Sequence, residues 1–148
     1  MKQWIPAIKD SNDVDIVGLT DISPENRAVA ATALGDGRVA QGPDIRQLLA
    51  NVQPDIVFDC TPPGAHADVT LAALESGCHV LGEKPLADSM ATARKMVNAA
   101  EKADRIYAVM QNRRYHPALR AIADYVRSGN LGCLTTLTSD FFIGAHFG

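Results

Sequence analysis

Short apolar runs alternate along this chain with longer segments in which apolar residues recur at helical spacing. Runs rich in β-branched residues are typical of strands, and their alternation with helical patterns is typical of a parallel sheet built from strand–helix–strand units. The run at 55–60 is nearly continuous in apolar residues, which predicts a strand covered by helices on both faces. The predicted strands span 14–20, 38–40, 55–60, 78–82 and 106–110.

Capping residues set the limits of the predicted helices. Ser23, Pro24 and Glu25 offer an N-cap, a proline at the first helical position and an early carboxylate, and Gly35 ends that helix. Gly77 ends another helix, just before the strand at 78–82. The other predicted helices span 43–52, 64–76, 88–103 (with Asp88 or Ser89 as the cap) and 117–129.

The N-terminal segment reads as the helix that would follow a missing first strand. Its apolar residues between 4 and 8 lie on one helical face, just before the strand at 14–20. The letters at 35–40 match GxGxxA, but they follow a helix and precede a strand, so no helix N-terminus would face a pyrophosphate there. We therefore interpret 35–40 as a helix C-cap and a turn, and expect the fold to lack its first strand and glycine-rich loop.

The fold class expected from these elements is α/β, a doubly wound parallel, Rossmann-like sheet over residues 1–130. The segment 133–143 differs from the rest of the chain. Its apolar and polar residues alternate, it is rich in Thr and Phe, and it has no helix after it. We expect 131–148 to be the start of a second α+β domain, cut short after its first strand. Loss of the central strand of the first domain predicts a weakly stable or aggregating fragment.

Composition excludes several classes of function. The chain has 148 residues, 47% of them hydrophobic, and its net charge is −3 with scattered Lys and Arg, which argues against nucleic-acid binding. No apolar run is long enough for a membrane span, and no signal peptide begins the chain, so we expect a cytoplasmic protein without membrane partners. Cys60, Cys78 and Cys133 have no metal-binding spacing, and we interpret them as reduced core residues, with no metal site.

The most informative candidate site is Glu83-Lys84-Pro85, where the strand at 78–82 ends and a helix follows. Open parallel sheets bind ligands beyond the carboxyl ends of their strands, so a charged triplet there is placed for chemistry. The alternative is a solvated loop, since surface ion pairs are common and contribute little.

Three further candidates follow predicted strands. Asp21 stands where a nucleotide fold places the acid that binds the adenosine ribose, which favours NAD over NADP; it could equally be a turn residue. Thr61-Pro62-Pro63 offers a rigid wall for a flat ring, although prolines after strands are usually turns. His66, near the start of the next helix, could donate to a cofactor or be a helix residue whose hydrogen bonds are satisfied within the protein.

Asp59 lies inside an apolar strand. A buried carboxylate there needs a hydrogen-bonding partner.

The chain resembles the Gfo/Idh/MocA oxidoreductases over nearly its whole length, and Glu83-Lys84-Pro85 is the most diagnostic motif. The resemblance implies that Glu83 and Lys84 flank a nicotinamide and that the Lys84–Pro85 peptide is cis. It also implies a homo-oligomeric parent protein. The other matching segments are Asp21, 54–57, 61–63, His66, 112–115 and 140–142. By the same resemblance, the cofactor-binding residues are Asp21, Thr61, Pro62, His66, Glu83 and Lys84.

The implied reaction is hydride transfer between nicotinamide and a hydroxyl or carbonyl of a sugar, polyol or inositol-like substrate. Lys84 is the candidate catalytic residue, as the group that binds or protonates the substrate oxygen. Arg114 and Tyr115 are candidate substrate contacts, with solvated surface as the alternative. We expect NAD as the cofactor and the 148-residue chain alone to be inactive. The rival interpretation is a non-catalytic fragment or a regulatory nucleotide-fold subunit without a phosphate loop.

Overall fold

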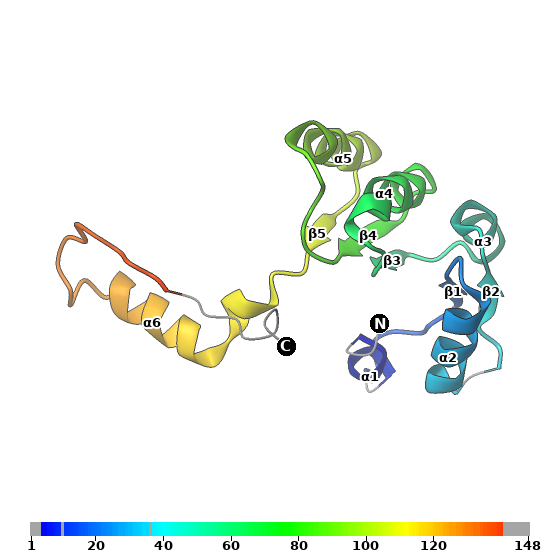
Figure 1. Cartoon of the computed structure of the whole chain (residues 1–148), viewed down its shortest axis with the longest axis horizontal. Helices are drawn as coiled ribbons and strands as arrows, with labels where there is room; N and C mark the ends of the chain where they lie inside the picture. The colour runs from blue at the N-terminus through cyan, green and yellow to red at the C-terminus, as the bar shows by residue number, and fades with distance from the viewer. Residues whose placement is uncertain (1–3, 10, 36, 141–148) are drawn as a thin grey trace. The chain divides into compact units, whose positions relative to one another are not determined.

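The structure, a computed structural model, describes residues 4–9, 11–35 and 37–140 (Figure 1). By compactness the chain forms two units, Met1–Met110 and Gln111–Gly148. The first unit contains α1 (Trp4–Lys9), β1 (Gly18–Thr20), α2 (Pro24–Leu34), β2 (Ala40–Gly42), α3 (Ile45–Val52), β3 (Ile56–Asp59), η1 (Pro63–Ala65), α4 (His66–Glu75), β4 (His79–Gly82), α5 (Met90–Ala103) and β5 (Tyr107–Val109). The second unit contains η2 (Asn112–Tyr115) and α6 (Pro117–Arg127).

The strands are parallel, as the sequence predicts for strands joined by helices. β1 pairs with β2, with Gly18 opposite Ala40. β4 lies between β3 and β5 in a second sheet, with Asp59 opposite Gly82. Within the described ranges, no ladder joins β1 to β3. The parallel α/β architecture of the predicted fold is confirmed.

Local capping chemistry explains where the helices begin and end. Ser23 accepts a hydrogen bond from the Asn26 amide, and Gly35 closes α2 in the left-handed conformation at φ 70°. Ser89 caps α5, so the choice between Asp88 and Ser89 is settled in favour of Ser89. α3 begins two residues later than predicted, because the Asp44 side chain, following Pro43, accepts from the first amides of that helix.

The core of the first unit lies around α4 and β4. Ala72, Ala73 and Leu74 are buried on α4, against Val80 of β4 and Ala100 of α5. β4 is the best-covered strand of its sheet, because both its edges are paired. The prediction that 55–60 is covered on both faces is wrong at Ile56, which is 46% exposed, whereas Val57, on the opposite face, packs against the core.

Other strand limits differ from the prediction for reasons of pairing. The predicted strand at 38–40 is shifted to Ala40–Gly42, because the register with Gly18–Thr20 sets its position. Val14 and Val17 are exposed and precede β1.

Gly18 lets α3 approach β1 closely, since a Cβ on Gly18 would lie 3.2 Å from the Leu48 side chain.

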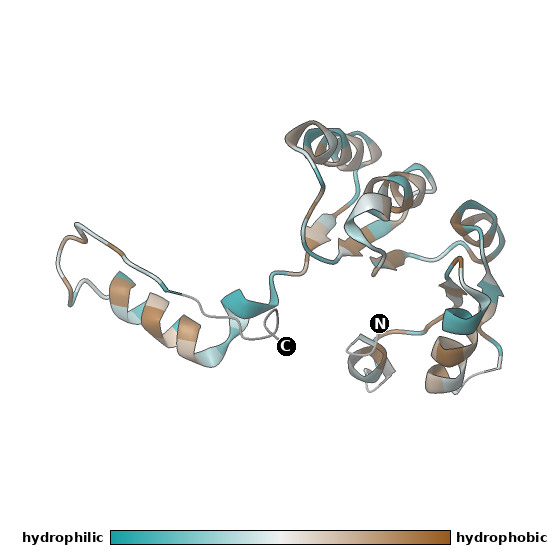
Figure 2. Cartoon of the chain, in the orientation of Figure 1, coloured by the Kyte–Doolittle hydropathy of each residue, from teal (hydrophilic) through white to brown (hydrophobic). Residues whose placement is uncertain are grey.

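The second unit carries the amphipathic helix α6. Leu119, Ile122 and Tyr125 are exposed on it, and Figure 2 shows the apolar residues that recur along this helix. The predicted strand at 133–143 has no ladder over 133–140, because a strand's hydrogen bonds need a partner strand; residues 141–143 lie outside the described residues. The domain boundary near 130 stays a prediction, and compactness divides the chain before α6 instead.

The cysteines do not all belong to the core. Cys78 is buried and its thiol donates to the Pro54 carbonyl, whereas Cys60 is half-buried. The prediction of a core position is wrong for Cys133, which is exposed because it lies in the unpaired segment after α6. Among the described residues, no helix combines the length and hydrophobicity needed to cross a bilayer. The described residues also contain no group of three or more His, Cys, Asp or Glu side chains that could hold a metal ion.

Candidate functional site

The strongest candidate segments lie at the carboxyl ends of two neighbouring strands. The turn Thr61-Pro62-Pro63, here called the Thr61 turn, follows β3. The loop Glu83-Lys84-Pro85, here called the Lys84 loop, follows β4. The Glu83 amide donates to the Asp59 carbonyl at 2.9 Å, which extends the ladder between these strands by one residue. The structure therefore brings the Thr61 turn and the Lys84 loop together at one edge of the sheet, where open parallel sheets bind ligands.

Glu83 is fixed by two hydrogen bonds. Its carboxylate accepts from the Trp4 indole Nε1 at 2.6 Å and from the Lys84 amide at 3.2 Å. Trp4 also packs edge-on against Phe58 of β3, with 5.3 Å between ring centroids. The Lys84–Pro85 peptide is cis, as the family resemblance implies, and the Lys84 side chain is exposed. The loop thus presents a lysine to solvent beside a carboxylate that is held in place.

Trp4 is a site residue that sequence reasoning missed. The pattern assigned it to the apolar face of the N-terminal helix and gave no partner for its indole N–H. A tryptophan in contact with protein usually finds an acceptor for that group, and this requirement was the available signal. The partner could not be identified from the sequence, because 79 positions separate Trp4 from Glu83.

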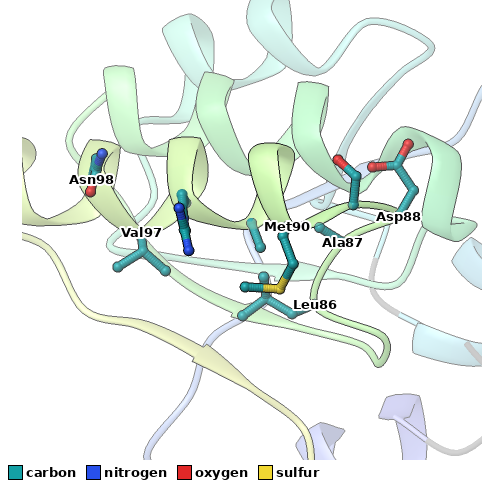
Figure 3. Close-up of a pocket in the computed structure, with 9 residues that line it drawn as sticks. Leu86, Ala87, Asp88, Met90, Val97 and Asn98 are labelled. Carbon is teal, nitrogen blue, oxygen red and sulfur yellow. The ribbon is translucent and has the colours of Figure 1, made fainter.

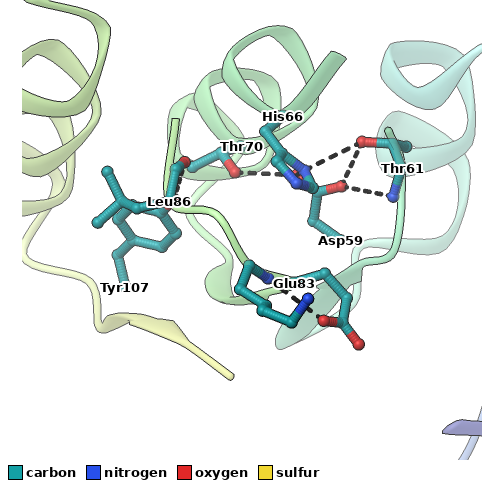
Figure 4. A network of polar contacts seen from close by, with 8 residues as sticks. Asp59, Thr61, His66, Thr70, Glu83, Leu86 and Tyr107 are labelled. Carbon is teal, nitrogen blue, oxygen red and sulfur yellow. Dashed lines mark hydrogen bonds and ion pairs between the residues drawn. The ribbon is translucent and has the colours of Figure 1, made fainter. Parts of the chain in front are cut away.

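Beneath these loops the Asp59 carboxylate is 1% exposed and has several donors around it. One oxygen accepts from the Thr61 amide at 3.1 Å and from the Thr61 hydroxyl at 2.6 Å. The other accepts from the Thr70 hydroxyl at 3.1 Å and lies 3.3 Å from His66 Nδ1. These contacts, drawn in Figure 4, supply the partners that a buried carboxylate requires.

His66 belongs to this buried cluster. Its ring is 2% exposed, and Nδ1 faces the Asp59 carboxylate and the Thr61 hydroxyl, both within 3.3 Å. The Asp59 and Thr61 oxygens near His66 act as acceptors. Nδ1 is therefore the ring nitrogen that carries a hydrogen and donates it. Nε2 is buried and has no hydrogen-bond partner among the described residues. The contact of His66 with a cofactor stays a prediction; the geometry shows a buried helix residue that supports the Thr61 turn.

Asp21 follows β1 and makes the contacts of a turn residue. Its carboxylate accepts from the Ser23 amide at 2.8 Å and from the Asn26 side chain at 3.3 Å, and the Arg27 guanidinium donates to its carbonyl. These bonds brace the start of α2. The turn role considered for Asp21 is therefore present, and its role toward a ribose stays a prediction.

Arg114 and Tyr115 lie in the second unit, in η2. Both are exposed, and the Arg114 guanidinium lies over the Tyr115 ring, 5.6 Å from its centroid. This cation–π pair orients an arginine side chain at the surface. Contact of this pair with a substrate stays a prediction.

An apolar hollow lies between the segment 86–90 and α5. Figure 3 shows Leu86, Met90 and Val97 pointing into it, with Asp88 at one end and Asn98 at the other. None of the predicted site residues lines this hollow. It is adjacent in sequence to the Lys84 loop, and its lining also includes the polar residues Asp88, Ser89, Arg94 and Asn98.

Cys60, between Asp59 and Thr61, is expected to react slowly. Burial raises the pKa of its thiol from 9.0 to about 11. Since the thiolate is the nucleophile, its fraction below pH 9 falls by about 100-fold relative to an ordinary cysteine. Alkylation by iodoacetamide, followed by mass spectrometry of the Cys60 peptide, should therefore accelerate about tenfold per pH unit up to about pH 11. A rate that levels off near pH 9, as in the urea-unfolded chain, would contradict this.

Comparisons with known proteins place these features in a family context. The Gfo/Idh/MocA family model, described as "Oxidoreductase family, NAD-binding Rossmann fold", matches residues 1–111. D-glucoside 3-dehydrogenase of Escherichia coli K12 is 32% identical over 86% of this chain and 36% of that protein. 1,5-anhydro-D-fructose reductase of Ensifer adhaerens is 31% identical over 88% of this chain and 39% of that protein. The chain therefore spans well under half the length of these curated relatives.

Solved structures agree with this match. The WlbA dehydrogenase of Bordetella pertussis, solved in complex with NADH and UDP-GlcNAcA, superposes with a TM-score of 0.82. It is 26% identical, and the match covers 88% of this chain and 37% of that one. Myo-inositol 2-dehydrogenase of Lactobacillus plantarum superposes with a TM-score of 0.80 at 20% identity, over 88% of this chain and 39% of that one, which supports the Rossmann-like fold alone.

Proposed function

Because the chain belongs to the Gfo/Idh/MocA oxidoreductase family with an NAD-binding Rossmann fold, we propose that the whole protein is an NAD(P)-dependent oxidoreductase. It transfers a hydride between nicotinamide and the hydroxyl or carbonyl carbon of a sugar, polyol or inositol-like compound. The names of the relatives support this substrate class, since they include a D-glucoside dehydrogenase and a 1,5-anhydro-D-fructose reductase.

The observation that carries the proposal is the pairing of the Thr61 turn with the Lys84 loop at adjacent strand ends. The residues there suit the nicotinamide end of a dinucleotide. Pro62 and Pro63 offer exposed apolar surface, and Glu83 offers a fixed carboxylate acceptor. The cofactor supplies hydride transfer, which the side chains of the protein cannot supply. Thr61, Pro62 and Glu83 would hold it, and Asp21 would contact its ribose.

Lys84 acts on the substrate oxygen. Its exposed ammonium group donates a hydrogen bond to the oxygen of the carbon that loses or gains hydride. On reduction, the oxygen takes up a proton as hydride adds to the carbonyl carbon, and Lys84 is the proton donor. On oxidation, the neutral amine form of Lys84 takes up the hydroxyl proton while the hydride leaves the carbon for the cofactor. Glu83, held by Trp4, keeps the start of the loop in place.

Binding of the cofactor to the whole protein tests the proposal directly. We expect calorimetric titration with NADH to give saturable binding in the micromolar range, and weaker binding of NADPH, because the Asp21 carboxylate repels a 2′-phosphate. Asp21→Asn should reduce the difference between the two cofactors, whereas Asp13→Asn, at an exposed position before β1, should not. Absence of binding to either cofactor would favour the rival interpretation, a non-catalytic nucleotide-fold chain.

A further inference from the structure

Tyr107 of β5 contacts the chain on both sides of the Lys84 loop. Its hydroxyl donates to the carbonyl of Leu86, the residue directly after the loop, at 3.3 Å. Its ring lies against Gly82, the residue directly before the loop, because a Cβ on Gly82 would lie 3.6 Å from ring carbon Cε2. Figure 4 shows Tyr107 beside Leu86. A single side chain therefore contacts both residues that border the loop.

The strand register explains how Tyr107 reaches the loop. Tyr107 pairs with Val80, two residues before Gly82 at the end of β4. The contacts with Gly82 and Leu86 show that the side chain leans along the strand toward its carboxyl end. The ring also packs against the apolar core of the first unit. The hydroxyl is therefore brought to the loop by a strand whose position the core sets.

The Tyr107 hydroxyl stays protonated at neutral pH. Burial raises the pKa of this phenol from its ordinary value of 10.0, so the group remains a hydrogen-bond donor. A phenylalanine would fill the same space without a polar group that needs a partner. What the hydroxyl adds to apolar packing is direction, since a hydrogen bond in a partly buried place fixes where its acceptor lies. The acceptor here is backbone, which makes the hydrogen bond a constraint on the course of the chain.

The loop is held on both sides of its exposed lysine. Glu83 and Leu86 are half-buried, whereas Lys84 between them is exposed. Glu83 accepts a hydrogen bond from the Trp4 indole at 2.6 Å, and Leu86 accepts one from Tyr107. The lysine side chain thus extends from a backbone that is fixed before and after it. Small misplacements of a reacting group lower rates strongly, so fixing this backbone matters if the lysine meets a substrate.

We propose that Tyr107 is a positioning residue, which sets the Lys84 loop by holding the Leu86 carbonyl. The chemical importance of that position rests on the proposed function of Lys84. The hold on the loop does not rest on it, because the hold depends only on contacts within the first unit. The two ideas can therefore fail separately.

Hydrogen exchange of the whole protein, read by mass spectrometry of a peptide covering residues 82–88, measures the hold on the loop. Tyr107→Phe removes the hydroxyl and keeps the ring, and should accelerate exchange of this peptide about 3- to 10-fold. The Glu83 amide, which donates to the Asp59 carbonyl at 2.9 Å, should contribute to the change as the loop opens more often.

Two comparisons separate a local effect from general loss of stability. Exchange of the buried helix α4 should stay within about twofold of the wild type in Tyr107→Phe, because the core packing of the ring is kept. Tyr125→Phe, at an exposed tyrosine on α6, should change neither peptide. Equal exchange of residues 82–88 in the wild type and in Tyr107→Phe would overturn the proposal.

Kinetics of the whole protein test whether Tyr107 acts through the lysine. Tyr107→Phe should lower kcat about tenfold and leave the dissociation constant of NADH unchanged. In a Lys84→Ala background, the same substitution should lower kcat less than about twofold, because no lysine remains to be misplaced. If Lys84→Ala itself lowers turnover, an equal loss from Tyr107→Phe in both backgrounds would overturn the positioning role.

The two measurements distinguish failure of this proposal from failure of the proposed function. If exchange of the loop accelerates in Tyr107→Phe while Lys84→Ala leaves turnover intact, the role of Lys84 is wrong and the hold of Tyr107 on the loop stands. If Lys84→Ala removes most turnover while Tyr107→Phe leaves exchange of the loop unchanged, only the positioning role of Tyr107 is wrong.

Discussion

Lys84→Ala is expected to lower kcat of the whole protein by about 10²- to 10⁴-fold, the range that a positioned proton donor contributes. The affinity for NADH should change little, because the carboxylate of Glu83 and the Thr61 turn remain. The different effects on kcat and on NADH affinity follow from the geometry, in which Glu83 is fixed by Trp4 while Lys84 is exposed. An interaction made mainly in the transition state lowers kcat without weakening cofactor binding.

The measurement is steady-state turnover with a sugar or polyol substrate, together with calorimetric binding of NADH. Lys95→Ala is the matched control, because Lys95 is an exposed lysine on α5 outside the candidate site. It should retain wild-type kcat. Equal turnover of the Lys84 and Lys95 variants would remove Lys84 from the chemistry and leave the loop with a structural role.

Asp59→Ala is expected to lower the free energy of unfolding by about 3–5 kcal/mol, a large part of the stability of a typical domain. The substitution removes the acceptor shared by Thr61, His66 and Thr70, and it leaves the buried Thr70 hydroxyl and the part-buried Thr61 amide without the carboxylate that accepts from them. Leaving a buried donor unsatisfied costs more than the net contribution of the bond that it made.

Urea unfolding followed by far-UV circular dichroism measures this loss as a shift of the midpoint at constant slope. Asp55→Ala is the control, because that carboxylate is exposed just before β3 and should contribute within about 0.5 kcal/mol. A midpoint for Asp59→Ala equal to that of the control would show that the buried hydrogen bonds contribute little beyond apolar packing.

The ends of the helices and the parallel direction of the strands were predicted well from the sequence. Ser23, Gly35 and Ser89 cap helices as expected, because a cap involves only residues within one turn of the helix end. The parallel strands followed from their alternation with helices. The strand at 133–143 was predicted from alternation alone, and alternation cannot supply the partner strand that a ladder requires.

The candidate site was predicted only in part. Glu83 and Thr61 could be placed together, since parallel strands end at the same edge of a sheet. The partners of Asp59 could not be identified, because they depend on how α4 is rotated against β3, and the sequence alone does not fix that rotation. Tyr107 was recognised only as part of a strand, and its link to Leu86 crosses from one strand to the loop of another.

The contact between Trp4 and Glu83 has an optical consequence. Trp4 is the only tryptophan in the sequence, so all indole emission of the chain comes from one side chain. That indole donates to the loop carboxylate and packs on Phe58. Its emission wavelength and intensity respond to hydrogen bonding and to the polarity around the ring. The chain therefore carries a built-in fluorophore at the start of the loop that presents Lys84.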